Sequence, residues 1–228
     1  MQYRKALILG GSSGLGIEIA KYCLLESGAR EILTASSSNT DRHEGNVRTI
    51  YCDLRIRECV DSLAYRINND PGMAGIDLFF WIAGQLTRRD FADLRAEQVR
   101  EMLDVNLSGP LVIANAAWKQ MQMSPRPTHF VVISSSSGIK ARPQESVYVA
   151  AKHGQVGFAR SLALENKDRN LRILLVMPGG MRTPFWSAAQ PADFDSFLDP
   201  EKVACKIIET IDSQVEPFAE LSIPRGSL

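Results

Sequence analysis

The sequence has 228 residues, a formal net charge of zero, 45% hydrophobic residues and 23% charged residues. This length predicts one domain over residues 1–228 with one substantial core, and the composition is ordinary for a soluble globular protein. Because the net charge is zero, we do not expect electrostatic attraction to nucleic acids or to anionic membranes.

Short apolar runs alternate with helical patterns along the chain. A buried strand is predicted over 6–10, and a helix over 14–28 follows it, because apolar residues recur there every four positions. Further strands are predicted over 31–36, 47–54, 76–84, 129–138, 171–180 and 219–224, the last at a sheet edge. Further helices are predicted between Ile56 and Pro71, over 93–122, over 146–154, and over 199–212 with Asp199 as N-cap.

This alternation predicts an α/β fold. Most of the strands are uniformly apolar, which indicates a parallel sheet covered on both faces. We expect a Rossmann-like doubly wound sheet, mostly parallel, with about seven strands and helices on both faces. Ligands bind such sheets beyond the carboxyl ends of the strands, where the strand order reverses. The loops after the first, fourth, fifth and sixth strands are therefore where chemistry is expected.

Cysteine usage and the absence of targeting signals predict a cytoplasmic protein. The four cysteines show no C-x-x-C and no metal-ligand spacing, so we expect reduced thiols and no metal site. The longest apolar runs are too short to cross a bilayer, and the N-terminus lacks the apolar region of a signal peptide.

A glycine-rich turn, "GGSSGLG" over 10–16, follows the first strand. Gly10, Gly14 and Gly16 let the backbone turn tightly, and the next helix presents its N-terminal N–H groups, which suits a pyrophosphate. The alternative is a flexible turn that binds nothing. The other loop residues predicted to contact the cofactor are Ser12, Ser13 and Leu15.

The end of the second strand bears on the choice of dinucleotide. NAD sites usually place a carboxylate there for the ribose 2′-hydroxyl, whereas this chain has Ala35 followed by Ser36, Ser37 and Ser38. Serine hydroxyls can donate to a 2′-phosphate, and Arg42 could join them if the loop folds back. The sequence therefore favours NADP(H) over NAD(H).

Asp53 and Leu54 end the third strand. They could hold an adenine through the carboxylate and the adjacent backbone. Asp53 could equally be the N-cap of the following helix, and both roles could hold together.

Tyr148 and Lys152 share one face of a helix, since they are four residues apart. A nearby ammonium favours phenolate, so Lys152 is expected to lower the pKa of Tyr148 by roughly two to three, which requires about 3–4 kcal/mol. Tyr148 would then exchange a proton with a carbonyl or alcohol oxygen. A serine run over 134–137 precedes this helix and could orient the same oxygen, although such a run alone is often only a polar loop.

Together these motifs resemble the single-domain short-chain dehydrogenases/reductases. The resemblance covers about residues 5–184 and follows the family's order, with "GGSSGLG", "CDL", "AG", "VNLSG", "VVISSSSG", "YVAAK" and "MPGGMRT". It implies that Tyr148 is the catalytic acid/base, that Lys152 lowers its pKa and holds the nicotinamide ribose, and that Ser135 and Asn106 complete a tetrad. The further cofactor contacts that it implies are Ala83, Gly84, Pro178, Gly179 and Thr183.

Pro110 lies four residues after Asn106 within a helical pattern. A proline has no N–H, so the carbonyl of Asn106 is left for another donor. In the family the corresponding carbonyl holds a water that links to the lysine in a proton relay, and we expect the same here. The alternative is a simple kink in a long helix.

Trp81 and Ile82 depart from the family pattern, which usually has two asparagines before "AG". The hydrogen bonds that brace the central sheet must then come from elsewhere or be absent.

The segment over 184–199 carries Phe185, Trp186, Phe194 and Phe197. In the family this region covers the substrate pocket, and its aromatic residues suit an apolar or planar carbonyl compound; internal packing or a subunit interface explains them about as well. The resulting expectation is an NADP(H)-dependent oxidoreductase that interconverts a small carbonyl and a secondary alcohol. The alternatives are an NAD-linked alcohol dehydrogenase and a non-catalytic dinucleotide-sensing regulator. The resemblance also implies a homodimer or homotetramer.

Overall fold

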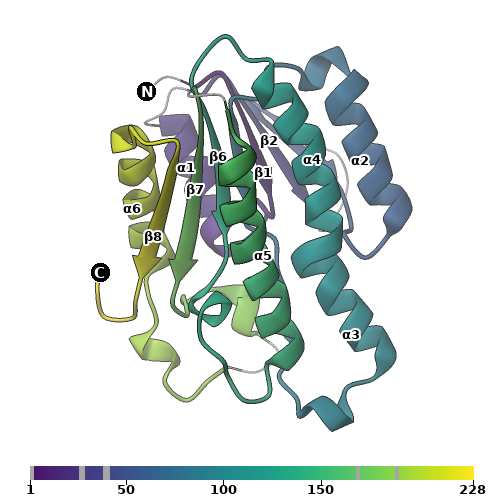
Figure 1. Cartoon of the computed structure of the whole chain (residues 1–228), viewed down its shortest axis with the longest axis vertical. Coiled ribbons are helices and arrows are strands. Elements are labelled where there is room, and N and C mark those ends of the chain that lie inside the picture. The colour runs from purple at the N-terminus through teal and green to yellow at the C-terminus, as the bar shows by residue number, and fades with distance from the viewer. Residues whose placement is uncertain (1–2, 26–28, 38–41, 168–169, 188–189) are drawn as a thin grey trace.

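A computed structural model describes residues 3–25, 29–37, 42–167, 170–187 and 190–228. Within these residues one sheet of eight strands lies between two layers of helices, in the order β3-β4-β2-β1-β5-β6-β7-β8 (Figure 1). All pairings are parallel except that of β3 with β4. The strands are β1 (Lys5–Leu9), β2 (Glu31–Ser36), β3 (Arg42–Glu44), β4 (Val47–Tyr51), β5 (Leu78–Trp81), β6 (Thr128–Ile133), β7 (Leu171–Pro178) and β8 (Phe218–Ile223).

The prediction of about seven strands is wrong by one, because β3 was missed. This strand has three polar residues and pairs with β4 through a tight turn at Gly45, whose φ is 57°. A run that short and polar shows no apolar periodicity, so only the geometry of the turn reveals it. The doubly wound class and the edge position of β8 are confirmed.

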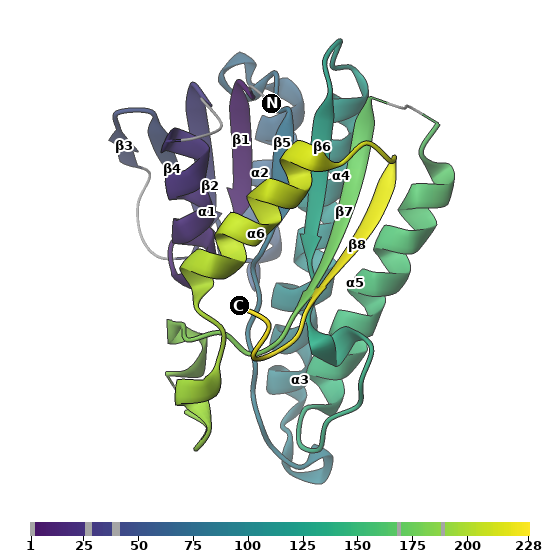
Figure 2. The same cartoon turned by 90° about the vertical axis from the view of Figure 1, so that its left-hand side faces the viewer.

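The helices divide the apolar residues between two cores. One core joins the sheet to α2 (Arg57–Asn69), α4 (Gly109–Gln122) and α5 (Ser146–Glu165). The other core lies beneath α1 (Gly14–Leu25) and α6 (Pro200–Ser213), which cover the opposite face (Figure 2). None of the helices in the described part of the chain is long and apolar enough to cross a membrane.

The strand order reverses between β1 and β5, which are adjacent although a long crossover separates them in the sequence. A crevice beyond the carboxyl ends of parallel strands is expected at this point. In Figure 1 these ends point downwards, towards α3 (Ala96–Leu103) and the segment over 184–199. The glycine-rich loop, Asp53 and the serine run over 134–137, which the sequence predicts to be functional, all follow strands at this edge.

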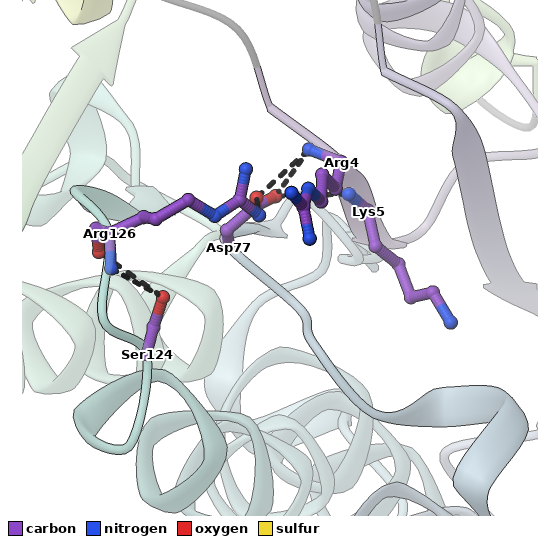
Figure 3. Close-up of polar contacts among 5 residues, drawn as sticks. All are labelled: Arg4, Lys5, Asp77, Ser124 and Arg126. Atoms are coloured by element: carbon purple, nitrogen blue, oxygen red, sulfur yellow. Dashed lines mark hydrogen bonds and ion pairs between the residues drawn. The ribbon is translucent and has the colours of Figure 1, made fainter.

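Asp77 braces the opposite, amino-terminal edge of the sheet (Figure 3). Its buried carboxylate accepts hydrogen bonds from the backbone N–H groups of Arg4 (2.9 and 3.1 Å) and Lys5 (3.0 Å), where β1 begins. The guanidinium of Arg126, just before β6, donates to it at 2.6 Å. One side chain thus ties together the starts of three neighbouring strands.

Trp81 takes an apolar role where the family usually has an asparagine. Its ring is fully buried and lies 5.8 Å from that of Phe158, and its indole Nε1 has no hydrogen-bond partner among the described residues. The backbone of the next residue, Ile82, donates to the carbonyl of Leu9 at 2.9 Å. The strand end is therefore held by packing and backbone bonds.

The predicted helix over 93–122 is interrupted. It consists of α3, a wider π-helical turn over Asp104–Ser108, and α4 with Pro110 in its first turn. The N–H of Gly109 bonds the carbonyl of Asp104, five residues back, so the extra residue of the turn shifts the register of the helix. Asn106 lies within this turn and is fully buried.

Candidate active site

A cavity of about 630 Å³ lies at the carboxyl edge of the sheet and brings most of the predicted residues together. The predicted residues that line it are Gly10, Ser12, Ser13, Gly14, Leu15, Ser36, Ser37, Asp53, Leu54, Ala83, Gly84, Ser135, Tyr148, Lys152, Pro178, Gly179 and Thr183. Gly16 and Asn106 lie behind the wall and do not line it. The aromatic residues Phe185, Trp186 and Phe197 form one end of the cavity.

The glycines of the first loop are required by their surroundings. Gly10 has a φ of 96°, and a Cβ there would lie 2.6 Å from the backbone nitrogen of Ala83. A Cβ on Gly16 would lie 2.1 Å from the carbonyl oxygen of Gly10. The loop therefore closes tightly onto α1, whose N-terminus faces the cavity, and this is the form that fits a dinucleotide pyrophosphate.

Thr183 closes this loop from the other side. A Cβ on Gly14, whose φ is 50°, would lie 2.9 Å from the Thr183 side chain. The segment after β7 and the glycine-rich loop are therefore in contact across the mouth of the cavity.

The serine-rich end of β2 also reaches the cavity. Ser36 is buried and Ser37 is exposed, and both line the wall. Ser38 lies outside the described residues, and the side chain of Arg42 is likewise not described. The backbone of Arg42 belongs to β3.

Asp53 forms an ion pair and does not cap a helix. Its carboxylate accepts from the guanidinium of Arg55 at 2.6 Å and from the backbone N–H of that residue at 3.0 Å. The side-chain hydrogen bond from Arg55 holds the pKa of Asp53 below its ordinary value. Since α2 begins at Arg57 with Ile56 as N-cap, the N-cap interpretation of Asp53 is wrong.

Tyr148 and Lys152 lie on the first two turns of α5 and are both almost fully buried. The Nζ of Lys152 is 5.7 Å from the centroid of the Tyr148 ring and donates to the carbonyl of Ile133 at 3.1 Å. Ser135 follows β6 and makes a hydrogen bond with Tyr148. A phenol, a lysine amine and a hydroxyl thus all line this cavity.

The pKa of Tyr148 is raised in this structure, whereas the sequence led us to expect a lowered value. Burial is the main cause, and the charge of Glu145 adds to it; the hydrogen bond with Ser135 and the charge of Arg142 offset part of the rise. Burial also lowers the pKa of Lys152 to about 7, so this side chain does not carry a fixed positive charge at neutral pH. The protonated phenol is therefore the resting form.

Asn106 connects the wall of the cavity to the helices behind it. Its side-chain amide donates to the carbonyls of Gln85 (2.8 Å) and Met102 (2.7 Å), and its Oδ1 accepts from the N–H of Gln85 at 3.1 Å. Its backbone carbonyl accepts from Nε2 of Gln155 at 2.7 Å, so another donor does reach it. That donor is a side chain, where the resemblance implies a water.

Several charged residues of the site were not predicted from the sequence. Glu145 is buried, lies 3.4 Å from the guanidinium of Arg88, and is the N-cap residue of α5, three residues before Tyr148. Arg142 donates to the hydroxyls of Ser136 (3.1 Å) and Ser137 (3.2 Å). The spacing of Glu145 from Tyr148 is the signal that could have found it.

The aromatic residues after Thr183 pack as a continuous series. Successive ring centroids of Tyr148, Phe185, Trp186 and Phe197 lie 6.1, 5.3 and 5.3 Å apart, and Phe194 lies 5.5 Å from Phe197. Residues 188–189 of the predicted lid lie outside the described residues. The series therefore combines internal packing with a wall next to the phenol of Tyr148.

The family model described as "short chain dehydrogenase" matches residues 4–193. The chain belongs to the short-chain dehydrogenase family. It is thus an oxidoreductase, as expected from the residues that meet in this cavity.

Relatives that are named as reductases or dehydrogenases agree with this membership. "Carbonyl reductase family member 4" of Xenopus tropicalis is 28% identical over 221 residues, 90% of this chain and 90% of the relative. Two solved structures have similar folds. A 4-hydroxyisoleucine dehydrogenase complexed with NADH has a TM-score of 0.81 at 23% identity, covering 98% of each chain. A short-chain dehydrogenase from Sphingobium yanoikuyae in complex with NADPH has a TM-score of 0.82 at 20% identity, covering 97% of this chain and 87% of that one.

Membership of the short-chain dehydrogenase family supports a nicotinamide dinucleotide as the cofactor and a small molecule as the substrate. The similar structures include complexes with NADH and with NADPH, so they do not discriminate between the two. Within the described residues, no group of three or more His, Cys, Asp or Glu side chains could hold a metal ion.

Proposed function

We propose that this short-chain dehydrogenase interconverts a small carbonyl compound and a secondary alcohol with NADP(H), and that Tyr148 is its general acid/base. One observation carries the proposal: Tyr148, Lys152 and Ser135 line the same cavity as the glycine-rich loop, and Nζ of Lys152 lies 5.7 Å from the centroid of the Tyr148 ring. A phenol next to a dinucleotide site is suited to exchanging a proton with an oxygen atom.

A dinucleotide held by the glycine-rich loop and Lys152 would supply the hydride for the reduction of a carbonyl compound. Tyr148 is protonated at neutral pH, as a tyrosine of ordinary pKa also is, so it holds a proton that it can donate to the developing alkoxide. Ser135 donates a second hydrogen bond to the same oxygen and holds it in line with the phenol. Lys152 holds the nicotinamide ribose. Asn106 holds the backbone of Gln85, which lines the cavity.

The preference for NADP(H) rests on the end of β2. Ala35 places no carboxylate near a 2′-phosphate, and the hydroxyls of Ser36 and Ser37 line the cavity at this point. The remaining cofactor contacts proposed from the sequence keep their assigned roles, with the glycine-rich loop on the pyrophosphate and Pro178, Gly179 and Thr183 near the nicotinamide. Asp53 and Leu54 are proposed to contact the adenine.

The substrate end is apolar on one side and charged on the other. Phe185 and Trp186 favour a planar or apolar carbonyl compound, and 184–199 is proposed as the lid. A cytoplasmic location and a homodimer or homotetramer are expected as well.

Two measurements test the proposed function. The first is the affinity for NADPH against NADH, followed by tryptophan fluorescence at fixed salt: tighter NADPH binding supports the assignment, and tighter NADH binding indicates an NAD-linked alcohol dehydrogenase.

The second measurement compares the turnover of Tyr148→Phe with that of Tyr65→Phe, at an exposed tyrosine of α2, on a panel of carbonyl compounds. Loss of the general acid is expected to lower kcat by about 10²–10⁴-fold with dinucleotide binding retained. Unchanged turnover in Tyr148→Phe would refute the role, and a wild type that binds dinucleotide without turnover would indicate a regulator.

A further inference from the structure

Gln155 is a fully buried polar residue one turn after Lys152 on α5. Its Oε1 accepts a hydrogen bond from Nζ of Lys152 at 3.0 Å. Its Nε2 donates to the backbone carbonyl of Asn106 at 2.7 Å. The carboxamide therefore joins the catalytic lysine directly to the carbonyl that the π-helical turn presents.

The orientation of this amide follows from its two partners. A backbone carbonyl only accepts, so the amide NH₂ must face Asn106, and the amide oxygen then accepts from Nζ of Lys152. The reversed amide would place its oxygen against the carbonyl oxygen of Asn106. Both ends are satisfied in one orientation only, which fixes the side chain.

This bridge determines the direction of the remaining donor of Lys152. In its protonated form Lys152 has three N–H groups, and Gln155 and the carbonyl of Ile133 take two of them. Gly84 lies beside Nζ, because a Cβ at this position would be 3.8 Å from it. The lack of a side chain at Gly84 therefore leaves space next to the third N–H of Lys152. Lys152 also lines the cavity, so its third N–H is available to a ligand there.

We propose that Gln155 is a positioning residue for Lys152, and that its carboxamide replaces the water expected between this lysine and Asn106. A water can accept one proton and pass on another. A carboxamide in this position keeps both of its N–H protons, because transfer through it would require an imidic acid form. The hydrogen-bonded path from Lys152 therefore ends at the carbonyl of Asn106, and the proton that Tyr148 gives up in a turnover is replaced from water in the cavity. This inference rests on the proposed function of Lys152 next to Tyr148.

The charged and titratable groups near this bridge are few. Tyr148 faces Lys152 from the same helix, and Glu145 and Arg142 act on Tyr148 from the segment just before α5. Burial lowers the pKa of Lys152. Removing the amide oxygen removes an acceptor that favours the ammonium, so the pKa of Lys152 should fall further.

The test is Gln155→Leu, which keeps the approximate volume and removes both polar ends. The control is Gln214→Leu, at a buried glutamine that donates to the carbonyls of Ile173 (3.0 Å) and Glu216 (2.9 Å), far from the site in sequence. The readout is the pKa of Lys152, from ¹³C NMR titration of the lysine Cε resonances with Lys152→Arg for assignment. This readout requires neither turnover nor a cofactor.

We expect Gln155→Leu to lower the pKa of Lys152 by about one and kcat by about tenfold, with KM changed less than about twofold. Gln214→Leu should leave the pKa of Lys152 unchanged. Gln155→Ala leaves room for a bridging water and should recover part of both losses. If Gln155→Leu does not fold, Gln155→Met is the substitute, with the same expected fall.

An unchanged pKa of Lys152 in Gln155→Leu would overturn the inference, whatever happens to kcat. An equal change in Gln155→Leu and Gln214→Leu would also overturn it, since it would indicate a general loss of structure. A fall in the pKa in a protein that reduces no carbonyl would contradict the proposed function and leave the positioning role supported.

Discussion

Replacing Asp77 with alanine tests how the amino-terminal edge of the sheet is held together. The buried carboxylate accepts from two backbone N–H groups and from the guanidinium of Arg126, whose side chain is 34% exposed. Each hydrogen bond to a charged group contributes about 1.5–3 kcal/mol, and water recovers part of the loss at the exposed guanidinium. We therefore expect Asp77→Ala to lower the free energy of unfolding by about 3–5 kcal/mol, a large part of the stability of a domain.

Urea unfolding at one protein concentration and fixed salt measures this loss, provided that the slope of the transition is unchanged. Asp61→Ala is the control, because Asp61 pairs with Arg57 on the surface, where both side chains are more than half exposed. It should cost less than about 0.5 kcal/mol. If Asp77→Ala cost no more than this control, the three hydrogen bonds would not brace the sheet and the reasoning would fail.

Three further predictions concern the cradle, the phenol and the core. Gly16→Ala should weaken dinucleotide binding by about 100-fold or more in a titration, because the added Cβ meets a carbonyl at 2.1 Å, whereas Gly157→Ala, with open space around it, should raise the free energy of unfolding by about 0.5–1 kcal/mol. Glu145→Gln removes a charge that raises the pKa of Tyr148, so the alkaline fall in the pH–rate profile should move to lower pH; a move to higher pH would contradict this. Burial lowers the pKa of His129 to about 3, below its ordinary 6.5, so the unfolded chain binds a proton that the folded one does not. Stability should therefore fall as the pH drops below about 6.5, by up to about 2 kcal/mol at about pH 5, and His129→Gln should remove this pH dependence.

The sequence predicted those features that depend on neighbours along the chain. The glycine-rich loop and the pair Tyr148 and Lys152 are local patterns, and the fold class follows from the alternation of strands and helices. The lining of one cavity by almost all of the predicted residues agrees with this local information.

The features that the sequence did not predict depend on contacts between distant residues. Gln155 reaches Asn106 across 49 positions, and Asp77 reaches Arg4 across 73, so no periodicity reveals either pair. The pKa of Tyr148 was expected to fall because a neighbouring lysine is visible in the sequence, whereas the burial that raises it is a property of the assembled site. Asp53 shows the reverse case, since its partner Arg55 is only two residues away and was overlooked in favour of a helix cap.

The two edges of the sheet also affect how copies of this chain can meet. β3 has only three residues, all polar, and β8 carries Glu220 in an ion pair with Arg160 at 2.7 Å. Short strands and charged residues at an edge make poor templates for the addition of a strand from another molecule. Growth of an extended cross-β fibril from the folded protein is thus disfavoured at both edges, and folded copies that associate are expected to do so through their helices.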